Sequence, residues 1–153
     1  MLACVDGDAV GRLFDRAREY VAPSAEWIAV HVVDTRGRVE LGLLRAGVPG
    51  AGPLGPEQRA EIAAAGLEHA QAVLGSFAAE AAARGLATGG AFQRVGEPGR
   101  EICALAQAER IDLIVLPAKR RPGPAHGPPS VGHTARFVLD HAPCAVLLLR
   151  GGR

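Results

Sequence analysis

Short apolar runs alternate along the chain with segments in which apolar residues recur every three or four positions. The apolar runs predict buried strands at residues 2–5, 27–33, 91–95, 111–116 and 144–149. The three-to-four spacing predicts amphipathic helices at residues 9–22, 56–84 and 131–141, and another that begins near Pro98. The predicted order of elements is therefore β-α-β-α-β-α-β-α-β.

This alternation predicts an α/β fold with a mostly parallel sheet and helices on both of its faces. No internal repeat or sign of a second domain interrupts the pattern, so we expect residues 1–153 to form one domain. Open sheets of this kind bind ligands beyond the carboxyl ends of their strands. That rule points to the segments after the first and fourth strands, residues 6–8 and 117–132.

Several residues mark the expected boundaries of these elements. Asp8 and Ser130 precede helices and are expected to cap them, while Pro56 suits the first position of the long helix. Residues 35–55 are rich in Gly and Pro without a sustained period, which predicts a long loop that is either mobile or functional. The long helix is expected to bury one apolar stripe, made of Ile62, Leu67, Ala70, Val73, Leu74, Phe77 and Ala81.

Composition and charge exclude several classes of function. The formal net charge of +1 gives no basic footprint for nucleic acid or for an anionic membrane. No run of apolar residues is long enough to span a bilayer, and the N-terminus lacks the pattern of a signal peptide. We therefore expect a cytoplasmic protein. Its three cysteines are far apart in the sequence and lie in apolar runs, so they are expected to be small buried residues rather than a disulfide or zinc framework.

Motifs of catalysis are also missing from the sequence. No GxGxxG follows the first strand, no GxxxxGK[ST] occurs, and no Ser-His-Asp arrangement can be placed from spacing. His31 lies within an apolar run and is expected to be a core histidine, whereas His126 and His133 lie in or beside a loop and are weak evidence for a metal site. We expect a binding protein rather than an enzyme.

Two regions of the sequence resemble the universal stress protein family. Near the N-terminus, residues 5–7 (VDG) and 31–34 (HVVD) are similar to the ends of the family's first two strands. Near the C-terminus, residues 112–116 (DLIVL), Gly132 and residues 141–149 (HAPCAVLLL) resemble the family's signature of strand, phosphate loop, helix and strand. The matches keep the family's order from residue 2 to 150. The resemblance implies a Rossmann-like fold of the adenine nucleotide alpha hydrolase type, with a five-stranded parallel sheet in the order 3-2-1-4-5.

The resemblance also implies a candidate nucleotide site. Many members bind ATP or AMP, and others bind no nucleotide. Asp6 matches the residue that contacts adenine in the family, Gly7 follows it, and Val32 matches a residue that lies against the adenosine. The alternative for Asp6 is a turn residue that helps to cap the next helix. Gly132 keeps the last glycine of the phosphate loop.

The phosphate loop departs from the family pattern at most of its other positions. Pro117 and Arg120 stand where the first two glycines are expected, and His133 followed by Thr134 replaces the expected Ser or Thr. The many prolines of residues 117–129 remove amide donors that would otherwise hold phosphate. Lys119 and Arg120 offer charge in their place.

Two functions follow as alternatives. The first is a stress-response or regulatory protein that acts through protein partners and dimerisation, with weak or no ATP binding and no obligatory cofactor. The second is a protein that binds adenine nucleotide (ATP or AMP), or another anion, through the altered loop. Slow ATP hydrolysis is a third and more remote alternative function. A homodimer is expected through the apolar C-terminal strand, residues 144–149, because exposed strand edges of this kind pair readily.

Overall fold

The computed structural model describes residues 1–7, 10–34, 55–118 and 131–150. Its centre is one parallel sheet in the order β3-β2-β1-β4-β5, which confirms the predicted order. The strands are β1 (Leu2–Cys4), β2 (Trp27–Asp34), β3 (Thr88–Gly96), β4 (Leu113–Ala118) and β5 (Ala145–Arg150). β1 therefore lies in the middle of the sheet, and β3 and β5 form its two edges.

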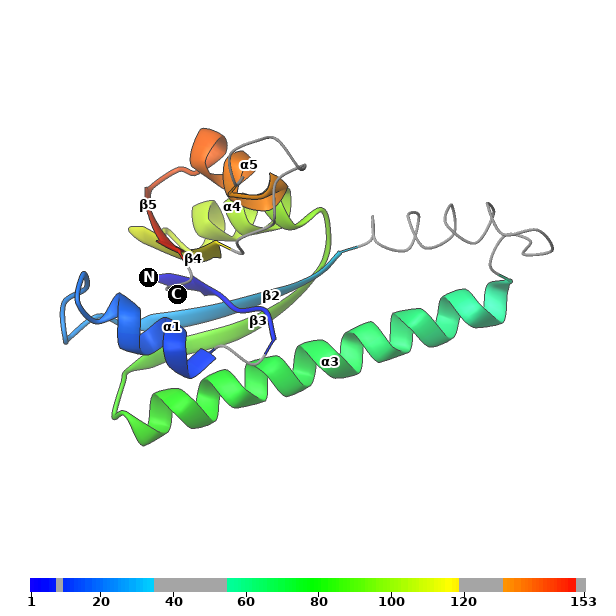
Figure 1. The fold of residues 1–153 in the computed structure, drawn as a ribbon, viewed down its shortest axis with the longest axis horizontal. Coiled ribbons are helices and arrows are strands. Elements are labelled where there is room, and N and C mark those ends of the chain that lie inside the picture. Colours follow the sequence, from blue (N-terminus) through cyan, green and yellow to red (C-terminus); the bar gives the residue numbers. More distant parts are fainter. Residues whose placement is uncertain (8–9, 35–54, 119–130, 151–153) are drawn as a thin grey trace, which may run out of the picture.

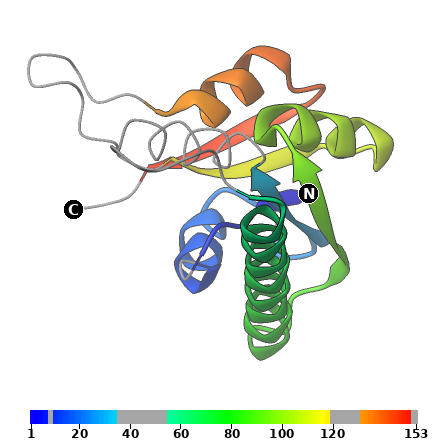
Figure 2. The same ribbon diagram turned by 90° about the vertical axis from the view of Figure 1, so that its right-hand side faces the viewer.

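Helices cover both faces of the sheet, as predicted (Figures 1 and 2). Helices α1 (Val10–Ala17) and α3 (Pro56–Ala83) lie on one face. Helices α4 (Pro98–Ala108) and α5 (His133–His141) lie on the other. Successive residues of a strand point to opposite faces, so Ala3 belongs to the first layer of the core whereas Leu2 and Cys4 belong to the second.

The core beneath α1 and α3 is built around Phe14. Its ring lies 4.9 Å from that of Trp27 in an edge-on arrangement and 5.1 Å from that of Phe77 (centroid distances). All three side chains are buried. Aromatic pairs at such separations add to the free energy gained from burial alone, so this cluster anchors both helices to β2.

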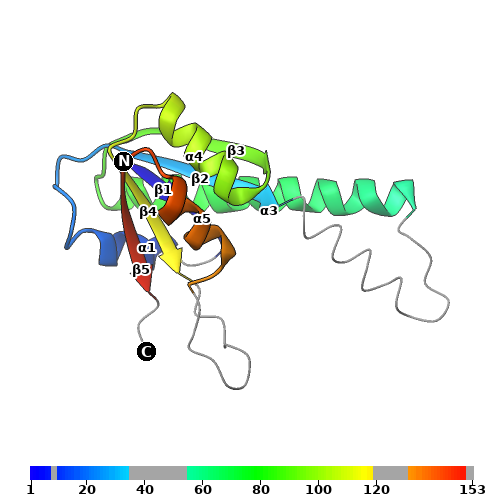
Figure 3. The same ribbon diagram turned by 90° about the horizontal axis from the view of Figure 1, so that it is seen from above.

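Helix α3 is longer than the sheet that it covers. Its 28 residues span about 42 Å at the usual rise per residue, and Figures 1 and 3 show its N-terminal half extending past the sheet. Its fully buried residues, Ala70, Val73, Phe77 and Ala81, all lie in the second half. The predicted apolar stripe is wrong at Leu67, which is 38% exposed, whereas its neighbour Gly66 lies against Val33 of β2.

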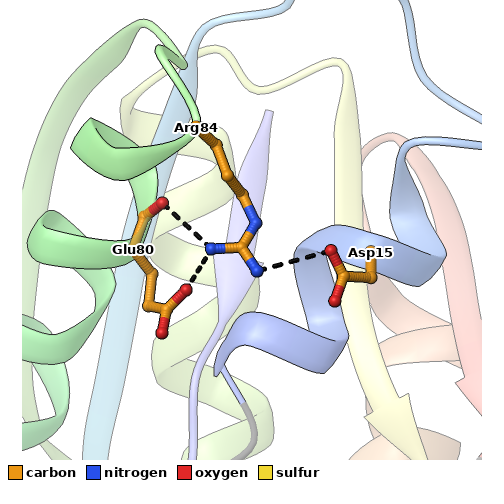
Figure 4. A network of polar contacts seen from close by, with 3 residues as sticks. All are labelled: Asp15, Glu80 and Arg84. Carbon is orange, nitrogen blue, oxygen red and sulfur yellow. Dashed lines mark hydrogen bonds and ion pairs between the residues drawn. The ribbon is translucent and has the colours of Figure 1, made fainter.

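Arg84 joins the C-terminal end of α3 to α1 (Figure 4). The guanidinium forms an ion pair with Glu80, one helical turn earlier, and its other terminal nitrogen lies 3.4 Å from Asp15 Oδ1. The same guanidinium carbon lies 5.7 Å from the centre of the Phe14 ring. The charged network therefore closes over the aromatic cluster at the surface.

Several predicted boundaries were wrong by a few residues. Helix α1 ends at Ala17, before the predicted position, and residues 18–20 form a turn held by a 2.9 Å bond from the Tyr20 amide to the Ala17 carbonyl. Pro117 belongs to β4 rather than to a loop. β1 pairs with β4 only at Ile114 and Val115, so no neighbour on that side requires an amide donor from Pro117.

Other boundary predictions concern caps and loops. The N-cap of α5 is Gly132, not Ser130, so the predicted cap was placed two residues too early. Asp8, Ser130 and the predicted loop at residues 35–55, apart from Gly55, lie outside the described residues. Among the helices that the structure describes, none combines the length and apolar character needed to cross a membrane.

Candidate functional site

A pocket of about 790 Å³ opens at the carboxyl ends of the central strands. β1 and β2 supply its floor through residues 4–6 and 30–34, and β4 adds Leu116 and Pro117. The start of α5 closes one side and α3 closes another. Its volume lies in the range of small-molecule sites, and its place is the one that the topology predicts for a ligand.

The turn after β1 brings Asp6 to the pocket. The Val5 amide donates to the Val30 carbonyl at 2.9 Å, which extends the pairing of β1 and β2 by one residue. Gly7 follows with φ of +70°, a conformation that favours glycine, so the chain turns away as soon as Asp6 has been presented. Asp6 lines the pocket as the sequence suggested, whereas Gly7 shapes the turn without lining it.

Val32 lies on the floor of the same pocket. It pairs in register with Arg94 of β3 and packs against the core layer beneath α4 and α5. The structure therefore brings Val32 and Asp6 together from neighbouring strands.

The opposite wall is the N-terminus of α5. Gly132, His133 and Thr134 all line the pocket, together with Ala135. No side chain caps the helix, and its first amides have no partner within the helix. The helix dipole adds a partial positive charge at this end. Gly132 adopts φ of +91° and ψ of 159°, a combination that is open to glycine almost alone.

Contacts between the two outer helices hold this wall in place. A Cβ on Gly99, in the first turn of α4, would lie 2.6 Å from the Phe137 ring of α5, so only glycine permits this close approach. Glu97, the N-cap of α4, lies 3.7 Å from His133 Nε2 and 2.9 Å from Arg100 Nε. A carboxylate therefore stands beside the first residue of α5.

The charges that face the pocket are mostly acidic in the described part of the chain. Asp6 and Asp34 line it, and its described lining contains no Lys or Arg. Lys119 and Arg120, the predicted basic contacts, lie outside the described residues. The N-terminus of α5 is therefore the favourable element for an anion that the described residues provide.

One thiol also reaches the pocket. Cys4 is buried, and burial raises the pKa of its thiol, with Cys103 adding to the shift. A thiol with a raised pKa is a poor nucleophile at neutral pH because little thiolate is present. All three cysteines are free, as predicted, although Cys103 and Cys144 are only partly buried.

Sequence reasoning missed the wall that α3 supplies. Gly66 and His69 line the pocket from this helix, and His31 lines it from β2. His31 is buried as predicted, yet it also faces the ligand space. The spacing of apolar residues along α3 does not show which turn of this long helix lies beside the carboxyl end of the sheet. The described residues contain no cluster of three or more His, Cys, Asp or Glu side chains arranged for a metal ion.

Comparison with known protein families identifies the family of this chain. The model of the universal stress protein family matches residues 1–150. The chain belongs to this family. No curated protein matches its sequence.

Several solved structures, universal stress proteins among them, share its fold. The hypothetical protein MJ0577 is 17% identical and superposes with a TM-score of 0.73, covering 99% of this chain and 96% of its own. The universal stress protein UspA from Lactobacillus plantarum is 23% identical with a TM-score of 0.64, covering 97% and 95%. A family member from Arabidopsis thaliana, solved with AMP bound, is 17% identical with a TM-score of 0.62, covering 99% and 91%. At these identities the likeness shows the fold.

Proposed function

We propose that this universal stress protein is a regulatory binding protein whose pocket holds an adenine nucleotide weakly, with little gain from additional phosphates. The observation that carries the proposal is the meeting of Asp6 and Val32 with the N-terminus of α5 around one pocket. Asp6 and Val32 would contact the base and the adenosine. The amides after Gly132 would receive a phosphate.

Two similar structures support an adenine ligand. The Arabidopsis protein was solved with AMP, and another universal stress protein, 19% identical with a TM-score of 0.58, was solved with cAMP. Each ligand carries one phosphate group. A pocket of about 790 Å³ has room for a nucleoside monophosphate.

The weakness for ATP follows from charge and from the loop sequence. Glu97 lies 3.7 Å from His133 at the N-terminus of α5, so added phosphates would meet its carboxylate. Residues 117–129 contain five prolines, each of which lacks an amide donor. The additional phosphates of ATP would therefore gain few hydrogen bonds to offset the repulsion caused by their negative charge.

Thermal unfolding with AMP, cAMP and ATP tests the proposal. A ligand at ten times its Kd stabilises the fold by about 1.4 kcal/mol, which raises the Tm of a chain of this size by roughly 3–6 °C. We expect such a rise with millimolar AMP and no larger rise with ATP. Asp6→Ala should abolish most of it, whereas Asp140→Ala, an exposed carboxylate of α5 outside the pocket, should not.

Two results would contradict the proposal. The site is wrong if no adenine nucleotide at millimolar concentration changes the Tm. The claim that additional phosphates add little affinity is wrong if calorimetry shows ATP binding at least tenfold more tightly than AMP. The proposal assigns no catalytic step, and phosphate release from ATP at a measurable, Asp6-dependent rate would contradict that part.

We also propose that the chain forms a homodimer through β5. This strand is an edge of the sheet, and its apolar side chains at residues 146–148 are only partly buried. An unpaired apolar edge favours pairing with another strand, and a two-fold axis would let β5 pair with its own copy. Such a dimer would place the two pockets on one particle for a regulatory partner.

Light scattering over a dilution series tests the dimer. We expect twice the chain mass at micromolar concentration, and a monomer for Val146→Lys, which places a charge in the middle of the edge. Val95→Lys is the matched control on β3, the other edge, where Val95 is 50% exposed. A monomeric mass for the unaltered chain, or equal masses for the two variants, would contradict pairing through β5.

A further inference from the structure

Two histidines meet at the side of the pocket formed by α3. The ring centroids of His31 and His69 lie 5.6 Å apart, and the ring planes are inclined by 76°. Both residues line the pocket. Neither is needed for the nucleotide contacts proposed above, so the pair requires its own explanation.

The hydrogen bond of His31 fixes its tautomer. Its Nδ1 lies 2.9 Å from the carbonyl oxygen of Val5. A carbonyl only accepts, so Nδ1 must carry the proton, and in the neutral ring the lone pair is on Nε2. The Val5 amide itself donates a hydrogen bond to the Val30 carbonyl, so the pairing of β1 and β2 sets the orientation of the ring.

Nε2 is the nitrogen of His31 that remains available to a ligand, and the residue lines the pocket. Among the described residues, Arg94 Nε is the only buried side-chain nitrogen or oxygen that lacks both a hydrogen-bond partner and solvent contact. No described residue forms a hydrogen bond with His31 Nε2, so this nitrogen is in contact with solvent although the residue is only 7% exposed. A histidine that donates through one nitrogen to a backbone carbonyl and leaves the other free has the arrangement of a metal ligand.

His69 supplies the second imidazole from a more adaptable position. It is exposed on α3, one turn after Gly66, so its ring can change rotamer without disturbing the core. Gly66 lets the helix approach β2 closely, since a Cβ there would lie 3.1 Å from Val33 Cγ1. Two imidazoles that bind one zinc ion at 2.0–2.1 Å have ring centroids about 5–6 Å apart. The observed separation is compatible with this, and a rotamer change of His69 would turn one of its ring nitrogens toward Nε2 of His31.

We propose that His31 and His69 form a two-histidine site for a divalent transition-metal ion of the zinc type, with water in the pocket completing the coordination. Imidazole nitrogen suits Zn²⁺, Ni²⁺ and Cu²⁺. The described residues offer no third side chain of the usual ligand types in a cluster with these two, so the affinity is moderate. The proposal does not depend on nucleotide binding.

Calorimetry with Zn²⁺ on the full chain, without nucleotide, tests the site. We expect one ion with a Kd in the micromolar range for the unaltered chain and at least tenfold weaker binding for His69→Ala. His69 is exposed, so this variant should fold normally. His141→Ala is the matched control, because His141 lies on α5 outside the pocket and stacks on Phe137. Because this titration contains no nucleotide, its outcome does not depend on the proposed nucleotide site.

Nitrogen NMR of the histidine rings identifies the ligands directly. Zn²⁺ should shift the Nε2 resonance of His31 and leave its Nδ1 protonated, and it should shift one ring nitrogen of His69. Zinc bound with full affinity by His69→Ala, or zinc that moves other histidine signals while these two stay fixed, would overturn the proposal. Absence of binding at 100 μM Zn²⁺, about a hundred times the Kd implied by micromolar affinity, would show that the rings form only an aromatic contact.

Discussion

Gly132 is the residue of the pocket at which a single methyl group should have the clearest effect. Its φ of +91° and ψ of 159° lie in a region that residues with a Cβ rarely enter. The space around it is open, since a Cβ would meet no atom within 4 Å. Any loss of stability in Gly132→Ala must therefore come from backbone strain rather than from a collision.

Gly75 provides a control with the opposite sign. It lies inside α3 and also has open space around its Cβ position, but its φ is that of an ordinary helix. Alanine there should stabilise the chain by about 0.4–1 kcal/mol, because it favours the helix and restricts the unfolded state. Alanine at Gly132 should cost about 1–3 kcal/mol. The two variants should thus differ by roughly 1.5–4 kcal/mol although each adds the same methyl group.

Urea unfolding followed by circular dichroism measures both effects. A difference of this size moves the midpoints apart by about 1 M, given the usual dependence on urea. AMP affinity provides a second measurement, since strain at Gly132 is relieved by shifting the first turn of α5 and its amides. A Gly132→Ala variant as stable as the unaltered chain would show that the observed backbone geometry is not required, and would remove the argument for a constrained phosphate wall.

Three further variants test the packing that positions the pocket. Gly99→Ala should destabilise the fold by about 1–3 kcal/mol in urea and weaken AMP binding, because its Cβ would collide with Phe137; unchanged values would mean that α4 and α5 move apart freely. Phe14→Ala should cost about 3–5 kcal/mol by the same assay, since its buried ring contacts both Trp27 and Phe77, and a loss below 1 kcal/mol would contradict its central role. Burial raises the pKa of Cys4 in the folded chain, so the free energy of unfolding should be level up to about pH 8 and fall as the pH rises past the unfolded value of about 8.5. Cys4→Ala should reduce that alkaline slope, and an unchanged slope would assign it to other groups.

The elements and their order could be predicted because each depends on local pattern. Runs of β-branched residues such as 27–33 have few alternatives to a buried strand, and β2 is observed at Trp27–Asp34. The ends of elements were harder because they depend on neighbours. A proline can continue a strand where no adjacent strand needs a hydrogen bond from its amide nitrogen. β1 pairs with β4 only as far as Val115, two residues before Pro117, and this limit cannot be deduced from the sequence.

The residues of the pocket also fall into a group that was predicted from the sequence and a group that was not. Asp6 and Gly132 lie in the segments to which the rule of the carboxyl ends pointed, whereas Val32, His133 and Thr134 were named from the family resemblance; all five line the pocket. The contribution of α3 was not predictable from its spacing. A helical period states which residues share a face, but not where along the helix the sheet ends. Leu67 was assigned to the core and is exposed, whereas Gly66 and His69 were not assigned to the pocket and line it.

The two walls of the pocket therefore have different constraints. The wall at α5 depends on glycine geometry and on helix packing, so it tolerates few substitutions at Gly132 and Gly99. The wall at α3 includes His69, whose exposed side chain is not packed in the core. A change at His69 should alter what the pocket binds without altering the fold, whereas a change at Gly132 should alter both. Measuring stability and binding together on these two residues distinguishes a site built into the fold from one added to its surface.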